Sequence, residues 1–100
     1  MKKSKAVKQL EKILDESFSF SVVVKGYRTR IGLTQEQLAL KLGVTKSYIS
    51  NIENKRDLVT VEQAKKFAKT LKEPIELWVQ VALQDMIDRA GIDAKVKLVA

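Results

Sequence analysis

The polar residues that follow Thr45 are the part of this sequence whose types and spacing suggest chemistry. Their ammonium, hydroxyl and amide groups fall on one side of a helical period and can hydrogen-bond to base edges in the major groove of DNA. They are Lys46, Ser47, Ser50 and Asn51. Ile49 and Ile52 fall on the opposite side, where a buried face is expected. The spacing therefore predicts a helix that buries one side and leaves a polar side free to read duplex DNA.

A helix that crosses this one steeply is expected just before it. Such a crossing needs a small residue at the contact and a turn residue that tolerates positive φ, and Ala39 and Gly43 supply them. The inward positions are apolar: Leu38, Leu42, Val44, Ile49 and Ile52. The pattern predicts a helix-turn-helix from Gln35 to Asn54. An ordinary αα-hairpin in a helical bundle would also place a glycine between two amphipathic helices.

Positive charge is concentrated around this motif. The chain of 100 residues has a formal net charge of +7, and residues 25–56 carry seven basic and only two acidic side chains. Residues 57–100 carry seven of each. A local excess of positive charge is typical of proteins that bind a polyanion, although a basic surface can also serve solubility.

Several classes of protein are disfavoured by composition. The chain has no cysteine and no histidine, so it lacks disulfides, thiolate metal sites and the commonest general base. Asp85 and Asp88 share a helix face without a third ligand. No apolar run approaches the ~20 residues of a membrane span, and the N-terminus lacks the pattern of a signal peptide. We expect a cytoplasmic protein that is not an enzyme and uses no cofactor or metal.

The whole chain has the periodicity of an all-α protein. Helices are expected over residues 4–17, from about residue 20 to 31, and over 35–42, 46–54, 61–71 and 74–90, with a strand-like tail over 94–99. Gly26 lies inside the second of these helices, which suggests a close packing contact there. Leu77, Trp78 and Val81 are expected to face the core from the last helix.

Three segments resemble a known family. They read Gly32-Leu33-Thr34-Gln35-Glu36-Gln37-Leu38-Ala39, then Leu42-Gly43-Val44, then Tyr48-Ile49-Ser50-Asn51-Ile52-Glu53-Asn54. In these segments the chain is similar to the XRE-type regulators, the phage-repressor and Cro family. The resemblance implies a lambda-repressor-like five-helix DNA-binding domain over residues 20–78 that binds operator DNA as a dimer. Residues 1–19 would then be an N-terminal helix and linker, and residues 79–100 a C-terminal extension.

The resemblance also implies roles for single residues. Lys46, Ser47 and Asn51 match the base-contacting positions, and Ser50 is adjacent to them. Positions that would contact the DNA backbone are Gln35, Thr45, Tyr48, Lys55 and Arg56. The family usually has Asn-Gly where this chain has Asn54-Lys55. The loop after the helix over residues 46–54, which is the expected recognition helix, could therefore close differently. Arg28 and Glu53 match an ion pair inside the domain, which we assign to structure rather than to DNA.

The last helix carries a second apolar stripe besides the one expected to face the core. The stripe consists of Ile75, Val79, Leu83 and Met86. Because operator recognition requires a two-fold axis, we expect it to form a homodimer interface. The helix over residues 4–17 could instead cover it within one chain.

The expected function is that of a repressor, and in its more specific form that of the autoregulatory antitoxin of a toxin–antitoxin pair. Short appendages at both ends would suit contacts with a toxin protein. A stand-alone phage-type or housekeeping repressor and a protein-interaction module are the alternatives.

Overall fold

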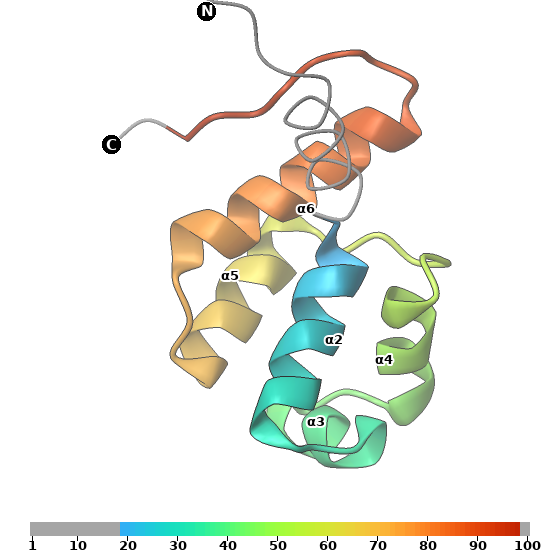
Figure 1. Cartoon of the computed structure of the whole chain (residues 1–100), viewed down its shortest axis with the longest axis vertical. Coiled ribbons are helices and arrows are strands. Elements are labelled where there is room, and N and C mark those ends of the chain that lie inside the picture. Colours follow the sequence, from blue (N-terminus) through green and yellow to red (C-terminus); the bar gives the residue numbers. More distant parts are fainter. Residues whose placement is uncertain (1–18, 99–100) are drawn as a thin grey trace, which may run out of the picture.

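The computed structural model describes residues 19–98, and this part of the chain is helical (Figure 1). The helices are α2 (Phe20–Ile31), α3 (Gln35–Leu42), α4 (Lys46–Glu53), α5 (Val61–Leu71) and α6 (Ile75–Arg89). Residues 92–98, which follow the last helix, contain no strand. The all-α prediction is confirmed. The helix expected over residues 4–17 lies outside the described residues.

Local signals determine where the middle helices begin and end. Thr34, Thr45 and Thr60 precede α3, α4 and α5, and each side chain accepts a hydrogen bond from a backbone N–H in the first turn. Gln37 returns a hydrogen bond to the Thr34 N–H, which completes a capping box. Gly43 ends α3 with φ 69°, a left-handed conformation that costs glycine little. The chain can therefore leave α3 and enter α4 with only three residues between the two helices.

The core lies where all five helices meet. Trp78 of α6 is fully buried, and the rings of Phe20 and Tyr27 contact it edge-on with centroids 5.5 and 6.3 Å away. Leu38, Ile49 and other apolar side chains complete the core, and no buried side-chain polar atom in the described region lacks a partner. In Figure 1, α2 lies beside α4, and α6 packs mainly against α5. The core holds α3 and α4 in a fixed position.

The end of the chain differs from the expected strand-like tail. The Gln84 side chain of α6 donates to the Ala94 carbonyl and accepts from the Val96 N–H, both at 2.8 Å. The described part of the chain offers no strand with which an alternating sequence could pair, so one glutamine amide satisfies these backbone groups instead. α6 also runs without a break across the expected boundary between residues 78 and 79.

Two packing predictions were wrong. A Cβ added at Gly26 would meet nothing within 4 Å, so no close contact explains this glycine. Leu77 is 37% exposed and does not face the core, whereas Trp78 and Val81 do. Both errors concern which side of a helix its neighbours cover, and tertiary contacts decide that.

Candidate nucleic-acid interface

The helix-turn-helix is built as its spacing predicted. Ala39 is buried at the contact between α3 and α4, and its carbonyl accepts a hydrogen bond of 3.0 Å from the Val44 N–H. Ile49 and Ile52 of α4 are buried in the core. Because one side of α4 is anchored in this way, the opposite side is presented outward.

The outward side of α4 is polar. Lys46 and Ser47 are exposed at its first turn, and Ser50 and Asn51 are half-buried along the same side. The structure thus brings the four predicted base-contacting residues onto one helix face. Lys46 also lies 3.5 Å from the Glu36 carboxylate of α3, and both side chains are largely exposed. Glu36 therefore belongs to this surface, although it was not among the predicted contact residues.

Asn54 extends the same face. Its side-chain amide donates to the Ser50 carbonyl at 2.8 Å and to the Ser50 hydroxyl at 3.2 Å. This contact orients a predicted base-contacting hydroxyl. The i, i+4 spacing between Ser50 and Asn54 was the available sequence signal, but Asn54 was considered only as the end of the helix.

Residues predicted to contact the DNA backbone lie around this face. Thr45 caps α4 by accepting the Tyr48 N–H at 3.1 Å. The Tyr48 ring packs edge-on against Phe67 of α5, with centroids 6.3 Å apart. Burial raises the pKa of the Tyr48 hydroxyl, an interaction with Gln63 lowers it, and nearby Asp57 raises it further. Tyr48 is therefore partly a packing residue, with its hydroxyl beside polar groups.

A polar groove lies where α3 and α4 both begin. It has a volume of about 440 Å³ and is lined by Arg28, Thr34, Gln35, Glu36 and Lys46. The N-terminus of α3 opens into it, and helix N-termini favour anions. Lys46 and the helix N-terminus favour an anion in this groove, whereas the Glu36 carboxylate opposes one and the Arg28 guanidinium is already engaged by Glu53 and the Leu33 carbonyl.

The Arg28–Glu53 ion pair connects the helices that form this groove. The Arg28 guanidinium donates to Glu53 through Nε at 2.9 Å and Nη2 at 3.0 Å, and to the Leu33 carbonyl through Nη1. The hydrogen bond with Glu53 raises the pKa of Arg28. Glu53 also accepts a hydrogen bond of 3.3 Å from the Gln35 side chain. One carboxylate at the end of α4 thus connects α2 with the first residue of α3.

The loop after α4 closes in the left-handed conformation. Lys55 has φ 59°, the region that glycine favours. The Arg56 N–H then donates to the Asn51 carbonyl at 2.8 Å. Lys and Arg side chains are both exposed in this loop. The departure from Asn-Gly therefore leaves this turn left-handed and replaces glycine with a cation.

Only the first half of the second apolar stripe of α6 packs against the core. Ile75 and Val79 are partly buried and pack against the core cluster. Leu83 and Met86 are also partly buried but do not belong to that cluster. The interface expected on this stripe is therefore centred on its second half.

Comparison with known proteins gives one match. A family model described as helix-turn-helix matches residues 24–78, just over half of the chain. The chain belongs to the XRE-type helix-turn-helix family. The match contains the polar face of α4, the groove and the Arg28–Glu53 pair. No curated protein and no solved structure matches the chain.

Membership of this family indicates that the protein is a DNA-binding transcriptional regulator. Regulators of this family are typically not enzymes. In the described region, no three His, Cys, Asp or Glu side chains are grouped so that they could hold a metal ion. No helix of that region is long and apolar enough to cross a membrane.

Proposed function

We propose that this regulator is a repressor that binds an inverted-repeat operator in double-stranded DNA as a homodimer. The observation that carries the proposal is the polar face of α4. Lys46, Ser47, Ser50 and Asn51 project from a helix whose other side is fixed in the core. A rigid helix with short polar side chains fits the major groove, where base edges present distinct donors and acceptors.

Phosphate contacts would hold this face in register. The groove at the start of α3 supplies Gln35 and a helix N-terminus, and Lys55 and Arg56 supply exposed cations in the loop after α4. Such contacts position a recognition helix without reading sequence. Two of these units, related by a two-fold axis, would occupy half-sites about one helical turn apart.

Salt dependence tests whether the partner is DNA. Binding of the full chain to a fluorescent random duplex is measured by anisotropy between low and moderate salt. Four cationic loop contacts in a dimer predict a slope of roughly −3.6 for the logarithm of the binding constant against that of salt, since each contact contributes about −0.9. A flat dependence would instead support a protein-interaction module.

The dimer is proposed to form through the second half of the α6 stripe. Leu83→Glu should convert the dimer to a monomer in analytical ultracentrifugation. Leu77→Glu is the matched control, because Leu77 lies on another side of α6 and is already 37% exposed. Equal effects of both substitutions, or a wild-type chain that is monomeric at high concentration, would refute this interface.

An autoregulatory antitoxin is the more specific form of the proposal. The tail supports it, because Ile92 and Leu98 are 56% and 40% exposed while Gln84 holds the backbone between them. Exposed apolar residues on a short backbone segment suit a protein partner. Co-expression with the product of the neighbouring reading frame tests this. A complex that is lost on deletion of residues 92–98 would support an antitoxin, and unaltered free protein would favour a stand-alone repressor.

A further inference from the structure

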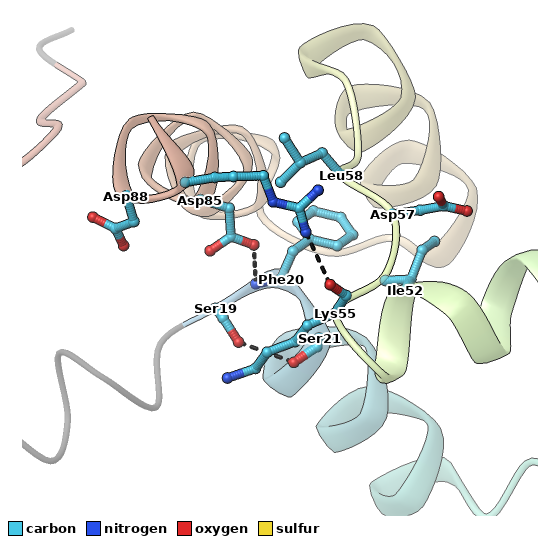
Figure 2. Close-up of a pocket in the computed structure, with 10 residues that line it drawn as sticks. Ser19, Phe20, Ser21, Ile52, Lys55, Asp57, Leu58, Asp85 and Asp88 are labelled. Carbon is cyan, nitrogen blue, oxygen red and sulfur yellow. Dashed lines mark hydrogen bonds between the residues drawn. The ribbon is translucent and has the colours of Figure 1, made fainter. Parts of the chain in front are cut away.

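The end of α6 is connected to the loop that follows the recognition helix. Nη2 of Arg89 donates a hydrogen bond of 2.9 Å to the Lys55 carbonyl, across 34 residues of sequence. Figure 2 shows Lys55 in the loop, with Asp85 and Asp88 on the facing helix. Arg89 lies outside the span 24–78 that matches the family. The contact therefore joins a residue outside the matched span to a loop inside it.

A second contact fixes the same face of α6. Asp85 lies one helical turn before Arg89, and its carboxylate accepts the Phe20 N–H at 2.8 Å. Ser19 precedes α2 but makes no capping hydrogen bond through its side chain, so Asp85 takes the place of the cap. α6 is thus attached at Asp85 to the start of α2 and at Arg89 to the Lys55 loop. Between these contacts is a cavity of about 210 Å³ (Figure 2).

The loop needs such support because of its conformation. A non-glycine residue in the left-handed region is strained, and Lys55 is such a residue. Its N–H donates to the Ile52 carbonyl at 3.1 Å, and its own carbonyl faces Arg89. The turn determines where the exposed Arg56 side chain leaves the end of α4. The Lys55 side chain runs from the same turn toward Ser19 and Ser21 and lines the cavity with Asp85 (Figure 2).

We propose that Arg89 is a positioning residue for DNA binding: by holding the Lys55 carbonyl it fixes the Lys55–Arg56 turn, from which Arg56 reaches the DNA backbone and the exposed Lys55 adds positive charge. The last turn of α6 is then part of the DNA-binding unit. This inference rests on the proposed function, since it concerns the phosphate contacts of that same surface. Its alternative is that Arg89, an exposed cation, contacts a phosphate directly.

A double-mutant cycle separates these two roles. Anisotropy with one duplex, at fixed salt, is measured for the wild type, for Arg89→Ala, for Lys55→Ala with Arg56→Ala, and for all three substitutions together. A positioning role predicts that Arg89→Ala weakens DNA binding about fivefold when Lys55 and Arg56 are present. This factor corresponds to the free energy of roughly one hydrogen bond. A positioning role also predicts almost no effect once Lys55 and Arg56 are alanine. Lys65→Ala is the control for charge, because Lys65 is an exposed cation on α5.

Hydrogen exchange provides a readout that does not depend on DNA. In Arg89→Ala the Arg56 amide, which donates to the Asn51 carbonyl, should exchange faster than in the wild type or in Lys65→Ala. Thermal unfolding of each variant shows that it is folded.

The outcomes separate the inference from the proposed function. An equal loss of affinity from Arg89→Ala in both backgrounds would identify a direct phosphate contact and overturn the positioning role. Unchanged affinity in Arg89→Ala, when Lys55→Ala with Arg56→Ala weakens binding, would overturn it as well. A wild-type chain that binds no duplex would refute the proposed function, and this inference with it.

Discussion

Arg28 and Glu53 join the first helix of the matched domain to the end of the recognition helix through two hydrogen bonds of 2.9 and 3.0 Å. The Glu53 side chain is only 5% exposed and that of Arg28 19%. Because the carboxylate also accepts from Gln35, this pair orients α4 and a predicted phosphate contact together. We propose that the primary role of the pair is within the fold.

Arg28→Ala should therefore lower the free energy of unfolding by about 3 kcal/mol, because it leaves a largely buried carboxylate without its cationic partner. Chemical denaturation measures the loss. Arg30→Ala is the control, since Arg30 forms an exposed pair with Glu73 whose loss should cost less than about 1 kcal/mol. If Arg28→Ala kept full stability and only weakened DNA binding, the structural role would be wrong.

Gly26→Ala should stabilise the protein by up to about 1 kcal/mol. The position lies inside α2, is exposed, and offers open space to a Cβ, so the higher helix propensity of alanine is gained without a clash. Thermal and urea unfolding test this. A decrease in stability would show that the exposed side of α2 is covered by a contact that requires glycine.

The two lysines in the left-handed region provide a matched pair. Lys55 and Lys72 have φ 59° and 58°. Glycine at either position should raise stability by about 0.5–1 kcal/mol, because strain is relieved at some cost in chain entropy. Only Lys55→Gly should also weaken DNA binding, since Lys72 ends α5. Equal effects on DNA binding would contradict the placement of Lys55 at the interface.

Asp85 should give the stability a specific pH dependence. Burial raises the pKa of its carboxyl, and the hydrogen bond from the Phe20 N–H opposes this without reversing it. A folded pKa above the unfolded value of about 3.9 means that folding favours the protonated form. The stabilisation from this group is complete below the unfolded pKa and is lost as pH rises through the folded pKa.

Asp85→Asn removes this titration while keeping an oxygen that can accept the Phe20 N–H. The free energy of unfolding of the wild type, relative to that of Asp85→Asn, should fall as pH rises from about 3 through the raised pKa. Denaturation of both proteins at a series of pH values gives this difference. A difference that grows with pH would mean that the ionised carboxylate is favoured in the folded protein.

The middle of the fold could be predicted because its signals are local. Threonine caps and the glycines at positions 32 and 43 act within a few residues, and the observed bounds of α3 agree with the expected ones. The polar face of α4 followed from helical periodicity in the same way. The pairing of Arg28 with Glu53 came from the family resemblance, since no short-range pattern links residues 25 positions apart.

Long-range contacts were not predictable in this way. The hydrogen bonds from Arg89 to Lys55 and from Phe20 to Asp85 join segments 34 and 65 residues apart. The exposure of Leu77 and the empty space beside Gly26 depend on which neighbours cover each helix. The backbone at Ala94 and Val96 hydrogen-bonds to the Gln84 side chain instead of forming a strand, because a strand also needs a second strand with which to pair.

The most direct test of the account is selection of binding sites from random duplexes by the wild type and by Lys46→Ala, Asn51→Ala and the control Lys65→Ala. The wild type and the control should select the same inverted repeat, with half-sites about one helical turn apart. Lys46→Ala and Asn51→Ala should each relax the preference at a different base position, by about 1–3 kcal/mol per lost contact. Unchanged half-site preference in both variants would contradict the assignment of the α4 face as the surface that reads DNA.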